Sequence, residues 1–254
     1  MSETGPESGA SRGTRRYLTI AALGLLVLVF TIVVASFADE ALTRTLVAWP
    51  APERAFFAWL TQWGESQWVL VPALVLALVG LAARFIPMAM TPKAMIRATG
   101  AAGALMFFGV GLPGLAASLL KRLIGRARPI HLDDAGVLGF SPASFGDWTF
   151  QGFPSGHATT AFATAVIVGV LFGKRQTWWI WIVAVLMALS RIVTGAHYLT
   201  DVLAGATLGT FGAMWVATVW ARRWRIPDRD GKGPGRLAAP FRRFLRRLRR
   251  QALR

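Results

Sequence analysis

Apolar runs close to the length that crosses a bilayer constrain this chain more than any other feature of its sequence. A membrane-spanning helix needs about 20 consecutive apolar residues, and here such runs alternate with short charged segments, while 54% of all residues are hydrophobic. We therefore predict an all-α, polytopic membrane protein with a helical bundle at its centre. The six predicted transmembrane helices are residues 17–37, 67–86, 98–120, 158–173, 177–193 and 201–221.

Three regions follow from this pattern. Residues 1–16 are polar and predict a disordered cytoplasmic tail, residues 17–221 form the membrane domain, and residues 222–254 form a basic cytoplasmic tail. The first apolar run has a cleaved signal peptide as its alternative, but it exceeds the usual core of about 7–15 residues, which favours a retained span. Residues 39–66 are too charged to span, and their tryptophans favour a short amphipathic helix at the membrane interface.

The basic residues predict the orientation. Most of the 28 Lys and Arg residues lie in the tails and in alternate loops, which puts both termini in the cytoplasm of a bacterial inner membrane. The net charge of +16 would suggest nucleic acid in a soluble protein, but membrane topology explains it better. No nucleic-acid partner is expected.

The basic tail has an apolar stripe at helical spacing. Phe241, Phe244, Leu245 and Leu248 would share one face of a helix whose remainder is mostly arginine. Such a helix is expected to lie on the anionic inner leaflet.

The first of three polar motifs ends the third apolar run. Lys121 and Arg128 are seven residues apart, so two helical turns would place both cations on one face, about 10 Å apart along the axis. Pro129 would end this helix and lead into a long loop on the outer side. The alternative is a basic helix end that reaches towards lipid headgroups.

The second motif, Pro154-Ser155-Gly156-His157, directly precedes the fourth span. Ser155 is a natural helix cap, and Gly156 lets the backbone approach a ligand. The first amide groups of such a helix point at an anion. A structural cap with an incidental histidine is the alternative.

The third motif runs from Ser190 to Asp201. If His197 and Asp201 open the last helix, their spacing of four puts them on one face, and Asp201 can accept a hydrogen bond from the imidazole. The other ring nitrogen could then attack phosphorus. A helix-end His-Asp pair beside an Arg191 that reaches to the interface is the alternative.

The three motifs fall on the same, outer side of the predicted topology, which was deduced without them. Lys121, Arg128 and Arg191 supply three cations, and a helix start supplies oriented amides. Such a pocket suits the charge on phosphoryl oxygens in a transition state. It also contains two histidines that could serve as nucleophile and acid.

Lys-x6-Arg-Pro at 121–129, Pro-Ser-Gly-His at 154–157 and Ser-Arg-x5-His-x3-Asp at 190–201 resemble the three signature motifs of the type 2 phosphatidic acid phosphatase superfamily, which includes vanadate-dependent haloperoxidases. The resemblance covers residues 98–221. It implies that His197 attacks phosphorus to give a phosphohistidine and that Asp201 orients it. It also implies that His157 protonates the leaving oxygen and then activates water. The implied phosphate-binding residues are Lys121, Arg128, Ser155, Gly156 and Arg191.

The expected activity is hydrolysis of phosphomonoester or pyrophosphate headgroups of lipids, with no metal or other cofactor. The motifs cannot choose among undecaprenyl pyrophosphate, phosphatidylglycerol phosphate, phosphatidic acid and lipid A phosphates. A non-catalytic lipid-phosphate-binding protein and a haloperoxidase are the alternatives, but both histidines are present and the spans argue against the second.

Other ionisable residues are assigned weaker roles. His131 is expected to be a surface histidine, and Asp133 and Asp134 a solvated turn that could alternatively bind a cation or exclude acidic substrates. Arg122 and Arg126 are expected to bind anionic headgroups or simply to reach to the interface. Ser190 is expected to be structural.

Overall fold

The computed structural model of the protein confirms the all-helical fold. It describes residues 26, 29, 33, 37–173 and 175–223, and in these the sole strand-like feature is an isolated bridge between Arg126 and Phe140. Residues 37–47 are helical. The longer helices are α2 (Ala51–Gln62), α3 (Gln67–Ala82), α4 (Met90–Ile124), α6 (Gly156–Phe172), α7 (Trp178–Val193) and α8 (Leu199–Arg223). The loop between α4 and α6 contains the short turns η1 (Pro129–His131), α5 (Leu132–Ala135) and η2 (Trp148–Phe150).

Several helical stretches can cross a membrane. Ala51–Ala82, Pro92–Ile124 and Leu199–Ala221 are long and apolar enough, while α6 and α7 are apolar but shorter, with 17 and 16 residues. The chain is thus an integral membrane protein by its helices. The N-terminal tail, nearly all of the first predicted span and nearly all of the basic tail lie outside the described residues.

The charged segment 39–66 is not the single interfacial helix that the sequence predicted. Two helices share it, namely residues 37–47 and α2, which begins after Pro50. Proline has no amide hydrogen to continue a helix, so the chain breaks there and restarts. After a short turn α2 is followed by α3, and the two together make one of the long apolar stretches. Phe56 and Trp59 on α2, and Trp63 directly after it, are more than half exposed.

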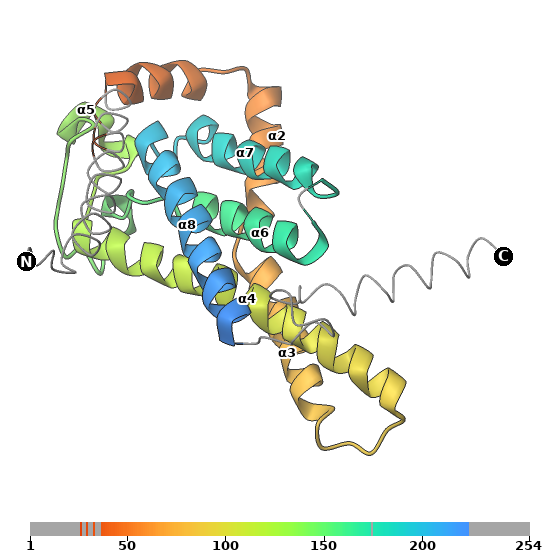
Figure 1. Ribbon diagram of the computed structural model, residues 1–254. Helices are drawn as coiled ribbons and strands as arrows, with labels where there is room; N and C mark the ends of the chain where they lie inside the picture. Colours follow the sequence, from red (N-terminus) through yellow and green to blue (C-terminus); the bar gives the residue numbers. More distant parts are fainter. Residues whose placement is uncertain (1–25, 27–28, 30–32, 34–36, 174, 224–254) are drawn as a thin grey trace, which may run out of the picture.

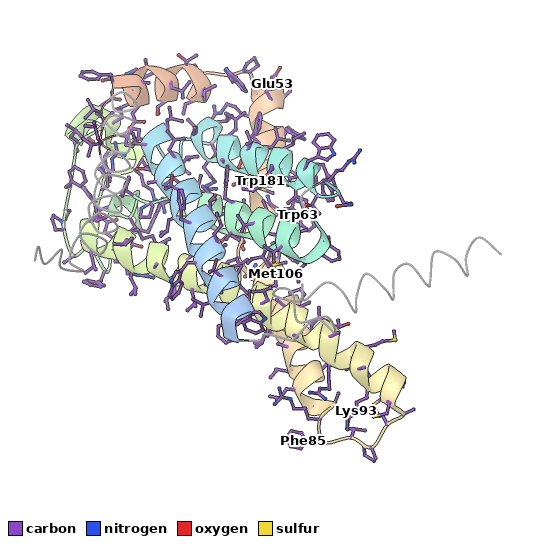
Figure 2. The ribbon with its side chains drawn as sticks, in the orientation of Figure 1. Glu53, Trp63, Phe85, Lys93, Met106 and Trp181 are labelled. Atoms are coloured by element: carbon purple, nitrogen blue, oxygen red, sulfur yellow. The ribbon has the colours of Figure 1, made fainter. Side chains whose placement is uncertain are left out.

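The longest helix, α4, supports the rest of the bundle. α6 and α8 pack against it and against each other, α7 packs on α6, and α3 lies along the first part of α4. Figure 1 shows the α3–α4 hairpin extending beyond the other helices. At its tip, where Figure 2 labels Phe85 and Lys93, the Lys93 ammonium donates to the carbonyls of Arg84 and Ile86 at 3.4 and 3.1 Å. This contact satisfies carbonyls beyond the end of α3.

Close helix contacts are made by small residues. Gly205 and Gly209 of α8 touch the backbone of Ser155 and Thr159, so that any Cβ at either glycine would collide with a carbonyl oxygen. We call this contact the glycine seam. Small residues at such crossings let helix backbones approach closely in membranes. The seam fixes the start of α6 against the first turns of α8.

An apolar core joins the helix at 37–47 to the bundle. Its buried members come from that helix, α2, α6, α7 and α8, and they are Leu46, Phe57, Ala158, Ala188, Ile192, Val193 and Val202. Burial of this apolar surface holds the N-terminal helix beside the start of α8.

The loop after α4 begins earlier than predicted. α4 ends at Ile124, because Gly125 adopts a left-handed conformation with φ of 65°, and a side chain there would collide with the Ser141 carbonyl. Glycine at this position is a common helix stop. Arg128 is therefore extended, and the prediction that it shares a helical face with Lys121 was wrong.

Candidate active site

The three polar motifs meet where α4 ends, α6 begins and α7 turns into α8. The Ser155 amide donates to the Asp201 carbonyl at 2.9 Å, which joins the second motif to the third. The Gly152 amide donates to the Arg126 carbonyl at 2.9 Å, and the Arg128 amide donates to the Thr149 carbonyl at 2.8 Å. Backbone bonds therefore lock the first motif onto the loop that leads into the second.

Among the buried polar atoms that find no hydrogen-bond partner in the residues that the structure describes, three lie at signature positions, one in each motif. These atoms are Arg128 Nε, Ser155 Oγ and Arg191 Nε. Buried polar groups are nearly always paired, and an unpaired one is costly. Three such donors, two of them on cations, therefore indicate a site for an anion. We call the candidate site of Lys121, Arg128, Ser155, Gly156 and Arg191 the anion pocket.

Arg128 and Arg191 each have neighbouring groups that position the guanidinium. The Arg128 guanidinium lies 5.0 Å from the centre of the Trp148 ring and donates to the Gln151 carbonyl at 3.5 Å. Arg191 donates to the Thr61 hydroxyl. Burial lowers the pKa of Arg128, and the negative charge of Asp201 only partly opposes this. An anion in the pocket would relieve the cost of burying that charge.

Lys121 and Gly156 complete the pocket. Lys121 is in the last turn of α4 and close enough to Arg128 for their charges to interact. Ser155 precedes α6, yet its hydroxyl makes no capping bond to that helix. A Cβ on Gly156 would meet nothing within 4 Å. The first turn of α6 therefore borders open space, as an anion site at a helix start requires.

His197 does not lie in the last helix as predicted. α8 begins at Leu199, and a turn at Gly195, with φ of 65°, separates His197 from α7. The His197 Nδ1 lies 2.7 Å from the Gly152 carbonyl and 3.6 Å from Asp201 Oδ2. A carbonyl only accepts, so Nδ1 carries the proton and Nε2 keeps its lone pair. The main partner of the imidazole is thus a backbone oxygen, with Asp201 beyond hydrogen-bond distance.

The surroundings of His197 keep it neutral. Burial lowers its pKa, Arg191 and Arg128 lower it further, and Asp201 opposes them. A neutral imidazole with a free Nε2 can act as a nucleophile.

His157 lies in the first turn of α6 and packs against the end of α2. A Cβ on Gly64 would fall 2.8 Å from His157 Cδ2, and the Thr61 backbone hydrogen-bonds to the imidazole. Its charge would interact with those of Arg191, His197 and Arg128. Thr61 therefore supports both His157 and Arg191, and this contribution of α2 had no signal in the sequence.

Arg126 is not an exposed headgroup ligand as predicted. Its guanidinium is 4% exposed and pairs with Asp201 Oδ1 at 2.6 Å and with Asp39 Oδ2 at 3.0 Å. It also donates to Thr200 and to the Val137 carbonyl. We call Asp39, Arg126, Thr200 and Asp201 the buried ion-pair cluster. Asp39 carries no motif signal in the sequence, where it is one of several charges in the segment 39–66.

The remaining ionisable residues lie away from the pocket. His131 Nε2 is 2.8 Å from the Thr149 hydroxyl, and its ring stacks on Phe150. Asp133 pairs with Arg44 at 2.7 Å, with both side chains exposed. Arg122 donates to the Ser118 carbonyl one turn earlier at 2.7 Å.

Ser190 is fully buried and donates to the Met187 carbonyl at 2.7 Å, a bond within its own helix.

Comparison with known proteins gives a consistent result. Residues 102–225 match the PAP2 superfamily. The chain is 38% identical to a lipid A 1-phosphatase of Rhizobium johnstonii over 173 residues, which cover 68% of this chain and 70% of the relative. It is 36% identical to a lipid A 1-phosphatase of Rhizobium etli, with 68% and 74% covered.

A solved structure has a similar fold. The crystal structure of a transmembrane PAP2-type phosphatidylglycerolphosphate phosphatase from Bacillus subtilis aligns with a TM-score of 0.53 at 24% identity, covering 79% of this chain and 98% of that one. The likeness extends over most of the described helices.

Proposed function

This chain belongs to the PAP2 superfamily and is a membrane lipid phosphatase, and from that premise we propose that it removes the 1-phosphate of lipid A. The two Rhizobium relatives support this substrate, because the similarity to them extends well outside the matched family region. The anion pocket supports the chemistry. The observation that supports the proposal is that each of the three motifs has a buried donor without a hydrogen-bond partner among the described residues, at Arg128, Ser155 and Arg191.

The first half of the reaction forms a phosphohistidine. Lys121, Arg128, Arg191, the Ser155 hydroxyl and the Gly156 amide hold the phosphoryl oxygens. His197 Nε2 attacks phosphorus, the bond from phosphorus to the leaving oxygen breaks, and His157 donates its proton to that oxygen. Fixed cations and amides stabilise the negative charge of the transition state. No metal takes part in this scheme.

The second half releases phosphate. His157, now neutral, accepts a proton from a water molecule, whose oxygen attacks the phosphorus of the phosphohistidine. The bond to Nε2 breaks and His197 returns to its neutral form. The Gly152 carbonyl keeps the Nδ1 proton in place throughout, so that the same nitrogen receives and releases the phosphoryl group.

The proposed arrangement has six spans, which are residues 17–37, α3, α4, α6, α7 and α8, with the active site on the outer side of a bacterial inner membrane. Because the chain has no cysteine, single cysteines report on each loop. Ala135→Cys should react with an impermeant maleimide in intact spheroplasts, whereas Gln176→Cys should react only after lysis. The reverse pattern would overturn the orientation.

The substrate is tested by phosphate release from defined lipids. Purified protein in detergent should release phosphate faster from lipid A carrying only the 1-phosphate than from lipid A carrying only the 4′-phosphate. Phosphatidic acid, phosphatidylglycerol phosphate and undecaprenyl pyrophosphate should also be slower. Equal or faster release from one of these would overturn the substrate, and no release from any of them would leave a lipid-phosphate-binding protein. A His197→Ala variant controls for contaminating phosphatases.

A further inference from the structure

A buried ion-pair cluster adjoins the imidazole of His197 on the side away from the anion pocket. Its two carboxylates, Asp39 and Asp201, are fully buried, and Arg126 lies between them. These residues are far apart in the sequence, since 87 positions separate Asp39 from Arg126 and 75 separate Arg126 from Asp201. Charges that leave water are retained only where they are well paired.

Every oxygen of Asp201 has an assigned partner. Oδ1 accepts from Arg126 at 2.6 Å, and Oδ2 accepts from the Tyr198 amide at 2.9 Å. The His197 Nδ1, at 3.6 Å, is only a third neighbour. Arg126 therefore sets the orientation of Asp201 more directly than His197 does.

Asp39, in the helix at 37–47, binds both Arg126 and the start of α8. Its Oδ2 accepts from Arg126 at 3.0 Å and from the Thr200 hydroxyl, while its Oδ1 accepts from the Thr200 amide at 3.0 Å. That amide belongs to the first turn of α8, where backbone donors lack partners within the helix. Asp39 thus caps α8 from another helix. It also holds the Arg126 guanidinium in place, and Arg126 in turn holds Asp201.

The charges of the cluster do not cancel. One guanidinium faces two carboxylates, so a net negative charge remains beside Nδ1. If Arg126 were absent, Asp201 would keep only the Tyr198 amide, among the described residues, as a partner of its side chain, and its Oδ1 could turn towards His197. This would favour the protonated imidazole, which cannot attack phosphorus. With Arg126 in place, the carboxylate is held at a distance and the Gly152 carbonyl remains the acceptor for Nδ1.

We propose that Asp39 and Arg126 are positioning residues for the nucleophile, which hold Asp201 and the start of α8 so that Nε2 of His197 faces the anion pocket. This inference rests on the proposed function. Arg126 lies inside the matched family region of residues 102–225, whereas Asp39 lies outside it. The helix at 37–47 therefore supplies a part of the active-site support that the three motifs do not contain.

The test uses full-length protein with three variants. Asp39→Asn removes one charge but keeps an acceptor for the Thr200 amide, and Arg126→Lys keeps the positive charge with fewer donors. Asp133→Asn is the matched control, because its exposed pair with Arg44 also ties the helix at 37–47 to the long loop but does not touch Asp201. The readouts are kcat, KM, the inhibition constant for inorganic phosphate and the midpoint of thermal unfolding.

We expect Asp39→Asn and Arg126→Lys to lower kcat about tenfold to a hundredfold, as small displacements of reacting groups do. KM and inhibition by inorganic phosphate should stay within about twofold, because the anion pocket is unchanged. Asp133→Asn should match the wild type in every readout. A merely structural role would instead weaken phosphate binding and turnover together.

The failures can be told apart. If the wild type releases no phosphate from any lipid phosphate, the proposed function fails. If the wild type is active and Asp39→Asn keeps its kcat, or loses turnover and affinity for inorganic phosphate in parallel, only the positioning role fails. Failure of both Asp39→Asn and Arg126→Lys to fold would likewise show that the cluster serves stability and would overturn the role.

Discussion

The buried ion-pair cluster and the anion pocket adjoin the same histidine, yet they treat arginine in opposite ways. Arg126 makes hydrogen bonds to two carboxylates, a hydroxyl and a carbonyl. Arg128, two residues further along, keeps a buried Nε without a partner among the described residues. One arginine is part of the protein interior, while the other is left ready for a ligand.

The difference shows that burial and hydrogen bonding together distinguish an arginine that stabilises the fold from one that can bind a ligand. A buried charge whose hydrogen bonds are complete stabilises one arrangement of the chain, and removing a partner is costly. A buried charge with a missing bond costs free energy in the empty protein and regains it when an anion binds. Function is therefore better indicated by an unsatisfied donor than by charge alone.

The largest expected effect is at the residue between the two regions. His197→Ala should lower kcat at least about a hundredfold, because the nucleophile is lost. The fold should persist, since neither the cluster nor the pocket loses a charge. Rapid quench of the wild type with labelled substrate should trap an acid-labile phosphoprotein, and the variant should give none. A stable phosphoprotein in the variant would show that another residue attacks phosphorus.

The next largest effect is a difference in stability and vanadate inhibition between variants of Arg126 and of Arg128. Arg126→Met leaves two carboxylates buried without their cation, and breaking such a pair costs about 3–5 kcal/mol. Arg128→Met instead removes a half-buried charge that has no carboxylate partner among the described residues, so its unfolding midpoint should equal or exceed that of the wild type. Its vanadate inhibition should weaken about tenfold or more, as for a charged hydrogen bond of about 1.5–3 kcal/mol.

Thermal unfolding in detergent, with and without vanadate, measures both quantities for these two arginine variants. If Arg128→Met destabilised the protein as much as Arg126→Met, the two regions would not differ in kind.

The smallest expected effect is on pH dependence. The pKa of His197 is lowered, chiefly by burial, so activity should fall with decreasing pH only below about 6.5, the ordinary value for histidine. Arg128 lowers that pKa and Asp201 raises it. Arg128→Met should therefore move the acid limb of kcat/KM to higher pH, and Asp201→Asn should move it to lower pH. Shifts in the same direction would contradict the assigned electrostatic roles.

Much of this architecture could be predicted from the sequence. Five of the predicted spans overlap α3, α4, α6, α7 and α8, because long apolar runs leave few alternatives to helices. The three motifs were also the segments that backbone hydrogen bonds bring together, whereas the phosphate-binding roles of Lys121, Arg128, Ser155, Gly156 and Arg191 stay predictions. Their spacing and residue types were specific enough to suggest a phosphate site.

Two local predictions failed for a reason that was visible in the sequence. The helix was extended through Gly125 to Pro129, and the last helix was begun at His197 instead of Leu199. In both cases a glycine with φ of 65° turns the chain, at Gly125 and at Gly195. A glycine after an apolar run is a common helix stop, and at both positions it determines the helix boundary more strongly than the spacing of the charged residues does.

The cluster of Asp39 and Arg126 could not be found in this way. Asp39 was read as one charge in an interfacial segment, and Arg126 as one more cation at a helix end. Their pairing depends on the N-terminal helix packing beside α8 through Leu46 and Val202, a long-range contact with no periodic signal. Single-sequence patterns identify faces of helices, but not which distant faces meet.

The glycine seam bears on how this enzyme can diverge. Gly205 and Gly209 let α8 touch the backbone that carries Ser155, so a larger side chain at either would drive apart the two segments that surround phosphorus. Substitutions at the two glycines should therefore be poorly tolerated, whereas substitutions in the loop at 133–150, where most residues are exposed, should be tolerated. New headgroup preferences could arise by substitutions in this loop, while the residues that carry out the reaction stay unchanged together.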